Sequence, residues 1–261
     1  MARRTPPKSV NPATAKQRML KQLICSDAPE QALRHRGFRL IAGIDEVGRG
    51  ALFGPVVAAA VILPEDCAHL APAGLKDSKQ MPREDRESMD VEIRTIALAF
   101  AIAEVDAATI DRINIYQATR VAMLTAVQSL TLAPDHLLID AMRLDHPCAQ
   151  TRLIYGDSLS LSIAAASVIA KVHRDALMRT LDLEHPQYGL ASHKGYATPE
   201  HRRALLAHGP TPLHRLSFAP CTPTTPQPAL FDIFLDDILD PEDLEACVSN
   251  EPAEPFQECV D

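Results

Sequence analysis

Two adjacent carboxylates, those of Asp45 and Glu46, end an apolar run and are followed by Gly48, Arg49 and Gly50. On a regular strand adjacent side chains point to opposite faces, so these acids can share a site only where the strand ends and the chain bends. Glycine supplies that bend and lets a ligand approach the backbone closely. Carboxylates hold hard divalent cations, whereas bare N–H groups and a guanidinium suit phosphate. The stretch therefore indicates a metal site beside a turn that contacts phosphate.

Two further acids follow strands that we expect downstream. Asp140 ends the apolar segment 136–140, and Asp157 follows a short strand expected over 153–155. In open α/β sheets, sites gather at the carboxyl ends of strands, so four acids are expected at one edge region. A single Asp in such a place is more often a turn or cap residue, and Asp157 could simply favour the positive end of the helix that starts at Ser160. Four acids at one expected edge favour a shared site.

The hydrophobic pattern predicts the elements that carry these acids. Apolar runs predict strands over 38–45, 56–63, 96–105, 136–140 and 153–155. The helical spacing of apolar residues and the residues that start or end helices predict helices over 29–36, 83–94, 106–130 with a break near Asn114, 160–184 and 199–208. The expected fold is α/β, with a mixed sheet of about five strands flanked by helices, helical elements near the C-terminal end, and flexible termini.

Composition excludes several classes of protein. The chain has 261 residues with 46% hydrophobic content but only 4% aromatic residues and no Trp, so a sizeable aliphatic core is expected. None of the six cysteines forms a C-x-x-C pair, so reduced thiols are expected rather than a zinc site or a disulfide framework. No apolar run approaches the roughly 20 residues that a membrane span requires, and no segment near the N-terminus resembles a signal peptide. We expect a cytoplasmic monomer without membrane contact.

Charge divides the chain into three parts. The net charge is −8, but no Lys or Arg follows Arg215, and six Asp and five Glu come after it. Residues 1–36 hold eight Lys and Arg against two acids. The expected organisation is a basic, flexible arm over 1–36, a folded domain over 37–220 and an acidic, Pro-rich, disordered tail over 221–261. A short helix is expected within the arm over 14–24. A flexible arm is the first interpretation, an arm that attracts nucleic-acid phosphates is the second, and an organellar transit peptide is the third.

The run IDEVGRGALFGPVVAAAV resembles the signature of ribonuclease HII, the type 2 ribonuclease H family. The resemblance continues with Asp-Ser-Lys at 77–79, with SIAAASVIAKVHRD after Asp157 and with Lys-Gly-Tyr at 194–196, and covers about residues 38–220. Arg49 between the two glycines favours this family over its relative ribonuclease HIII. The departures from the usual family residues are small: Ala51, Gln80 and Ala141.

The resemblance implies a ribonuclease H-like endonuclease that hydrolyses the RNA strand of RNA–DNA hybrids and incises 5′ to ribonucleotides embedded in DNA. The implied site holds two Mg²⁺ or Mn²⁺ ions about 3.5–4 Å apart and directs an in-line attack by water, which leaves a 5′-phosphate and a 3′-hydroxyl. The implied catalytic and metal residues are Asp45, Glu46, Asp140 and Asp157. The implied contacts to substrate phosphate, to the 2′-hydroxyl and to the RNA–DNA junction are Gly48, Arg49, Gly50, Ser78, Lys79 and Tyr196.

Two other classes of function remain open at this point. A phosphohydrolase for small phosphoesters would be expected to lack the Gly-Arg-Gly and Lys-Gly-Tyr loops, and a nucleic-acid-binding module without catalysis would be expected to have lost an acid. Among the remaining polar side chains, Lys171 and Arg174 are either surface charges or distant phosphate contacts, and surface positions are expected. His193 and His214 are expected to be structural or to face phosphate, because carboxylate-rich magnesium sites do not require them.

The acidic tail contains a second short motif. Gln227–Phe231 resembles the Gln-x-x-Leu-Phe peptide by which bacterial proteins dock on the replication sliding clamp. Such peptides place Leu and Phe anchors in an apolar groove. A motif with three fixed positions also arises by chance, and the apolar residues at 233–239 could instead form an amphipathic helix that folds back on the body.

Overall fold

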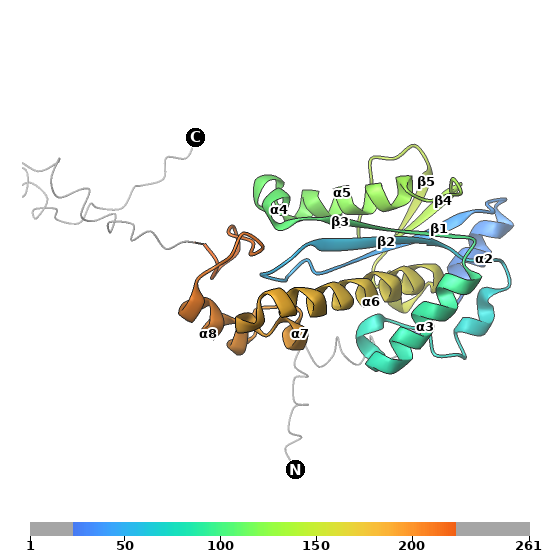
Figure 1. Ribbon diagram of the computed structural model, residues 1–261. Helices are drawn as coiled ribbons and strands as arrows, with labels where there is room; N and C mark the ends of the chain where they lie inside the picture. The colour runs from blue at the N-terminus through green and yellow to red at the C-terminus, as the bar shows by residue number, and fades with distance from the viewer. Residues whose placement is uncertain (1–22, 223–261) are drawn as a thin grey trace, which may run out of the picture. The chain divides into compact units, whose positions relative to one another are not determined.

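The structure is a computed structural model that describes residues 23–222. Most of the basic arm, including most of the helix expected over 14–24, and the acidic tail with Gln227–Phe231 lie outside these residues. Within the described part, one five-stranded sheet lies between two layers of helices (Figure 1). The helices α4 (Ala107–Ile113) and α5 (Ile115–Gln128) cover one face of the sheet. The helices α3 (Arg83–Ile96) and α6 (Leu161–Glu184) cover the other face.

The sheet is mixed, as expected. Its strands in chain order are β1 (Ile41–Val47), β2 (Val56–Ile62), β3 (Ala99–Val105), β4 (His136–Asp140) and β5 (Ala149–Leu153). Their spatial order is β3-β2-β1-β4-β5. β1 runs antiparallel to β2 but parallel to β4, and β4 runs parallel to β5. The carboxyl ends of β1, β4 and β5 therefore open at the same edge, which is where sequence reasoning expected the acids.

The last strand differs from the expectation of 153–155. β5 spans Ala149–Leu153 and pairs with β4 so that Asp140 lies opposite Leu153. Its sequence is polar and its side chains are half-buried or exposed, so no apolar run marks it. Tyr155 has a left-handed backbone (φ 60°), and Asp157 lies beyond it on the 3₁₀ turn η3 (Gly156–Ser158). Asp157 thus follows a turn and not a strand end.

The helices begin and end largely where their capping residues predict. Asn114 (φ 67°) separates α4 from α5, and its side chain accepts a hydrogen bond from the amide of Gln117, so it supplies the expected break. Ser160 caps α6 in the same way through the amide of Ile163. The remaining elements are α2 (Ala28–His35), α7 (Leu190–His193), α8 (Pro199–His208) and the 3₁₀ turns η1 (Cys67–Leu70), η2 (Ser78–Gln80) and η4 (Pro186–Tyr188).

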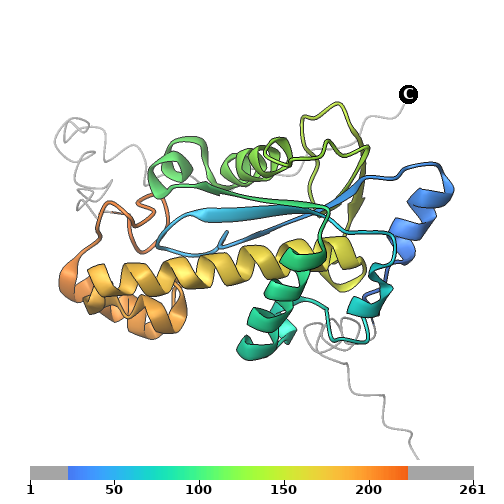
Figure 2. The same cartoon turned by 45° about the vertical axis from the view of Figure 1, so that its right-hand side comes forward.

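The core holds α6 tightly against the sheet. β2 is buried along its whole length, as its continuous apolar run predicts. Figure 2 shows the long helix α6, in yellow and orange, running along one face of the sheet. Its first turn touches β1 at Gly43, where a Cβ atom would lie 2.1 Å from the carbonyl carbon of Ser162. Glycine at this position therefore allows the start of α6, and η3 just before it, to approach the end of β1.

The folded region begins before residue 37, the boundary expected from the sequence. In α2, Leu33 and Glu30 are buried. Glu30 accepts hydrogen bonds from the Ser160 hydroxyl (2.5 Å) and the Ser162 amide (2.9 Å), so it fixes the start of α6. Within residues 23–222, every cysteine is a free thiol, and no helix is both long and apolar enough to cross a membrane.

Candidate active site

The four acids predicted from the sequence gather at one edge of the sheet. Asp45 and Glu46 lie in β1 just before its last residue, Asp140 ends β4, and Asp157 lies on η3. Burial raises the pKa of Asp45 well above its usual range. The neighbouring negative charges raise it further, those of Glu46, Asp140 and Asp157. The acids are therefore close enough to repel one another.

Backbone amides orient two of these carboxylates. Oδ1 of Asp45 accepts a hydrogen bond from the amide of Glu46 at 2.8 Å. Oδ1 of Asp140 accepts one from the amide of Gly156, also at 2.8 Å, which ties β4 to η3. Gly156 is packed so closely that a Cβ atom would lie 2.6 Å from Cδ1 of Ile163. A backbone amide thus holds one carboxylate oxygen of Asp45 and one of Asp140, and so fixes the orientation of both side chains.

Two basic side chains face the acids. Arg49 Nη1 lies 3.3 Å from Oε1 of Glu46, and Lys79 Nζ lies 3.5 Å from Oδ2 of Asp157. Burial raises the pKa of Glu46, and the charge of Arg49 lowers it in part. Burial is also the main reason that the pKa of Asp157 is raised to about 6, with the charge of nearby Asp77 as the next cause. Sequence reasoning included Asp77 in the Asp-Ser-Lys element but assigned roles only to Ser78 and Lys79.

The donor set fits a hard divalent cation. Within residues 23–222, no three His, Cys, Asp or Glu side chains lie close enough together to hold a metal ion as they stand. However, Oε2 of Glu46 is buried without a hydrogen-bond partner, and burial with mutual repulsion raises the pKa of the other acids. Oxygen-rich clusters of this kind are stabilised by Mg²⁺ or Mn²⁺. A cation would draw the carboxylates together and free Arg49 and Lys79 for other anions.

The Gly-Arg-Gly turn rests on a buried arginine of α6. Gly48 has φ +90°, and a Cβ atom there would lie 2.3 Å from Nε of Arg174. The Arg174 side chain is fully buried, so the expectation that it is a surface charge is wrong. It donates hydrogen bonds to the carbonyl oxygens of Phe53, Pro55 and Lys194 at 2.9–3.1 Å. The helical spacing of charged residues gave no signal that this one points inward.

A second buried arginine holds the same turn, and sequence reasoning missed it. Arg215 donates a hydrogen bond to the carbonyl oxygen of Arg49 at 2.8 Å and two to that of Gly54. Burial lowers the pKa of Arg215 to about 9. Neither Arg174 nor Arg215 forms an ion pair within the described part of the chain. Their positive charge therefore lies beneath the turn, where carboxylates such as Asp175 and Asp111 act on it only from beyond ion-pair distance.

The loop that carries Tyr196 (residues 194–196, the tyrosine loop) is joined to this turn through the backbone. Ala51 and Tyr196 form an antiparallel bridge, and the amide of Leu52 donates to the carbonyl oxygen of Gly195 at 2.8 Å. The guanidinium of Arg174 lies 5.6 Å from the centre of the Tyr196 ring. The structure thus brings Tyr196 and the Gly-Arg-Gly turn into one unit beside the acids.

A pocket of about 330 Å³ opens between the acids and the tyrosine loop. Its lining residues are Glu46, Val47, Ser78, Lys79, Ser167, Lys171 and Tyr196. The side chain of Lys171 is only 17% exposed, and burial lowers its pKa, so its expected role as a surface charge is also wrong. Two lysines and three hydroxyl-bearing side chains thus line this pocket next to the carboxylate of Glu46.

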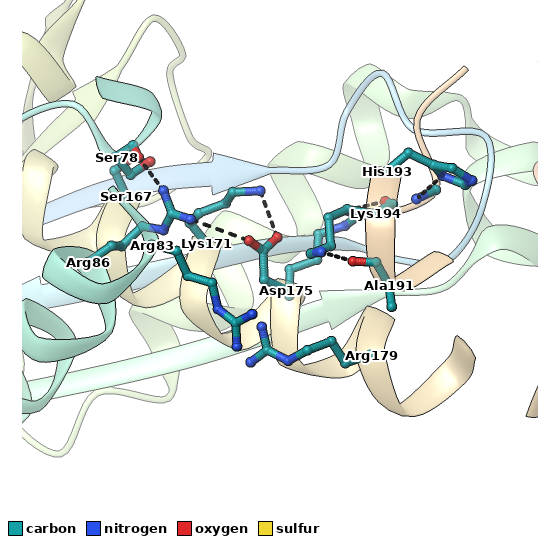
Figure 3. A network of polar contacts seen from close by, with 12 residues as sticks. Ser78, Arg83, Arg86, Ser167, Lys171, Asp175, Arg179, Ala191, His193 and Lys194 are labelled. Atoms are coloured by element: carbon teal, nitrogen blue, oxygen red, sulfur yellow. Dashed lines mark hydrogen bonds and ion pairs between the residues drawn. The ribbon is translucent and has the colours of Figure 1, made fainter. Parts of the chain in front are cut away.

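Figure 3 shows how the lysine side of the pocket is held. Lys171 and Arg86 point to the same carboxylate, that of Asp175, at 2.6 Å and 3.6 Å. Arg86 also donates to the carbonyl oxygen of Ser78 at 2.7 Å. The hydroxyl of Ser78 is buried and lies 2.9 Å from that of Ser167. Of the predicted Ser78–Lys79 pair, only Lys79 has an exposed side chain that reaches the acids.

A mixed sheet between two helical layers, with four acids at one edge of the sheet, is the arrangement of ribonuclease H-like nucleases, and solved structures share this fold. Ribonuclease H2 from Pyrococcus horikoshii OT3 aligns with a TM-score of 0.61 at 24% identity, over 69% of this chain and 94% of that chain. Ribonuclease HII in the PCNA complex from Archaeoglobus fulgidus aligns with a TM-score of 0.59 at 26% identity, over 69% of this chain and 95% of that chain.

The sequence places the chain within that class. The family model for ribonuclease HII matches residues 42–221. Ribonuclease HII of Koribacter versatilis is 53% identical over 233 residues, which cover 89% of this chain and 91% of the relative. That of Bacillus subtilis is 51% identical over 207 residues, 79% of this chain and 80% of the relative. The chain belongs to the ribonuclease HII family, and it is an endoribonuclease that acts on the RNA of RNA–DNA hybrids.

Proposed function

We propose that this enzyme incises DNA 5′ to a single embedded ribonucleotide as well as cutting within longer hybrids. The observation that carries this proposal is the bridge between Ala51 and Tyr196, which joins the Gly-Arg-Gly turn to the tyrosine loop beside the acids. The 2′-hydroxyl is what distinguishes RNA from DNA at one position. Backbone groups of Gly48, Arg49 and Gly50 would contact that hydroxyl. The Tyr196 ring would stack on the sugar that follows, which in this substrate is a deoxyribose.

The hydrolysis itself would depend on divalent cations. Two Mg²⁺ or Mn²⁺ ions bound by Asp45, Glu46, Asp140 and Asp157 would supply an activated water and neutralise the leaving 3′ oxygen, giving a 5′-phosphate and a 3′-hydroxyl. The hydrogen bond from the amide of Gly156 fixes the orientation of the Asp140 carboxylate, which would be one of their ligands. Arg49 and Lys79, which face two of the acids, would turn to the phosphodiester and hold it.

Cleavage of a duplex with one ribonucleotide tests this function. The purified enzyme should nick that duplex 5′ to the ribonucleotide with Mg²⁺ or Mn²⁺, and should leave an all-DNA duplex intact. Mapping of the product ends should give a 5′-phosphate and a 3′-hydroxyl. An enzyme that cuts a long hybrid but leaves the single ribonucleotide in place would refute the proposed incision.

We also propose that the tail peptide Gln227–Phe231 binds the cognate sliding clamp. The archaeal ribonuclease HII that shares this fold was solved as a complex with PCNA. A peptide covering 222–240 should bind the purified clamp in a titration, and Leu230→Ala with Phe231→Ala should abolish binding. An absence of binding by the wild-type peptide, together with hydrogen-exchange protection of the tail in the free enzyme, would favour a helix that folds back on the body.

A further inference from the structure

Two fully buried histidines lie behind the tyrosine loop. His201 comes from α8, and His214 comes from the segment that follows it. Their Nε2 atoms are 3.2 Å apart, which is a hydrogen-bonding distance. Nδ1 of His201 lies 3.0 Å from the backbone carbonyl oxygen of Tyr196. The pair therefore connects directly to the residue that is proposed to contact the substrate junction.

The neighbouring hydrogen bonds determine where the protons of this pair lie. The amide of Thr211 donates to Nδ1 of His214 at 2.9 Å, so this nitrogen carries no proton. The proton of a neutral His214 is then on Nε2, and it is donated to Nε2 of His201. Nε2 of His201 is consequently an acceptor, which leaves its proton on Nδ1, facing the carbonyl oxygen of Tyr196. All four ring nitrogens are satisfied in only this arrangement.

We propose that His214 and His201 are positioning residues, which set the Tyr196 loop through a one-way chain of hydrogen bonds from the Thr211 amide to the Tyr196 carbonyl. The chain requires both rings to be neutral, because a proton on the acceptor nitrogen of either ring would oppose a donor. On its other side the loop is held by Arg174, which donates to the carbonyl oxygen of Lys194 at 2.9 Å. That Tyr196 contacts the junction rests on the proposed function.

The surroundings of the pair favour the neutral rings. His193 of α7 stacks on His201 with 4.6 Å between ring centres, and Phe53 and Tyr188 lie 4.7 Å and 4.8 Å from His214. Neither ring has a carboxylate partner within residues 23–222. Burial lowers the pKa of both rings, that of His214 to about 4. The titratable or charged groups around the pair are His185, Tyr188, His193 and, next to His214 in the sequence, Arg215.

The tautomers can be measured directly in the wild-type enzyme. Nitrogen-15 chemical shifts of the histidine rings at pH 7.5 should show Nε2–H for His214 and Nδ1–H for His201. The opposite tautomer at either ring would overturn the chain. This measurement needs no substrate, so it stays informative if the enzyme does not cut single ribonucleotides.

Amide substitutions test whether the chain positions the loop. His201→Asn places an amide near Nδ1 and keeps a donor for Tyr196, whereas His201→Gln places it near Nε2 and loses that donor. His201→Gln should reduce kcat/KM on a single-ribonucleotide duplex by roughly tenfold relative to a long hybrid, the size expected for one lost hydrogen bond, and His201→Asn should lose less. His208→Gln, at the exposed end of the same helix, is the matched control.

The possible results separate this inference from the proposed function. If the wild type does not cut single ribonucleotides, the proposed function fails. The tautomer measurement alone then shows whether the chain of hydrogen bonds exists. If the wild type cuts them and His201→Gln and His201→Asn are equally active on both substrates, the positioning role is overturned. Circular-dichroism melting should confirm that each variant is folded, and a variant that is not folded is replaced by the corresponding pair at His214, where Asn keeps the Nδ1 acceptor.

Discussion

Gly48 lies directly on the guanidinium of Arg174, so close that a Cβ atom would be 2.3 Å from Nε. This contact joins the turn after the first two acids to the helix after the last one. It also explains why the turn has no room for a side chain at its first glycine, although the φ of +90° alone would already favour glycine.

Gly48→Ala should therefore damage both stability and cleavage. The new methyl group strains the backbone and collides with a buried side chain that has three carbonyl partners, so we expect a loss of about 2 kcal/mol or more in the free energy of unfolding. Gly50→Ala is the matched control, because nothing lies within 4 Å of its Cβ position and its φ is not in the left-handed range. Denaturant unfolding of the two variants should differ clearly, and equal stabilities would contradict the packing described here.

Asp140→Asn should keep the fold and nearly abolish cleavage. An amide oxygen can still accept the hydrogen bond from Gly156, but a neutral amide is a poor ligand for a hard cation. Thermal melting should show the wild type stabilised by Mn²⁺ by about 3 kcal/mol at a hundredfold excess over the dissociation constant. The variant should show little of this shift, and an undiminished shift would remove Asp140 from the metal site.

Sequence reasoning placed the acids well because their signals are local. β4 and α8 have the predicted bounds, and Asn114 breaks the helix at the predicted point. β5 was misplaced because an edge strand with polar side chains carries no hydrophobic signal. Arg174 was misjudged because a charged residue on a helix is usually solvated, and only the tertiary fold shows that carbonyl groups of distant loops surround it.

The same limit applies to the residues that hold the Gly-Arg-Gly turn and the loop of Tyr196. Arg215 and the histidine pair lie far from Gly48 in the sequence, and no spacing rule connects them. The role of Arg215 follows from its burial and from partners more than 100 residues away, the carbonyl oxygens of Arg49 and Gly54, whereas that of the histidine pair follows from its burial and from hydrogen bonds within residues 196–214. Local patterns therefore identified the groups expected to do chemistry but not the groups that position them.

Stability should fall as the pH drops from about 6.5 to about 4 because of His214. Its pKa is about 4 in the folded chain and 6.5 in the unfolded one, so the unfolded chain binds a proton first. The stabilisation is complete above pH 6.5 and corresponds to roughly 3 kcal/mol, which is lost as the pH falls to 4. Denaturant unfolding of metal-free wild type and His214→Gln at pH 7.5 and pH 5 isolates this effect, since the acid cluster is common to both. A difference between the two proteins that does not shrink at pH 5 would contradict the assignment.

Tyr196 should be needed for single ribonucleotides more than for stability. Its ring is half-buried beside Arg174, and only its backbone takes part in the bridge to Ala51, so Tyr196→Ala should leave the fold largely intact. Loss of a stacking contact of roughly 1–3 kcal/mol predicts a fall of about 5- to 150-fold in kcat/KM on a duplex with one ribonucleotide. Tyr196→Phe keeps the ring and is expected to retain most of this activity. Arg49→Ala should instead weaken binding and cleavage of every substrate, because it removes a charge that is proposed to hold the phosphodiester. If both alanine variants cut the single-ribonucleotide duplex at the wild-type rate, the Gly-Arg-Gly turn and the tyrosine loop do not recognise the junction.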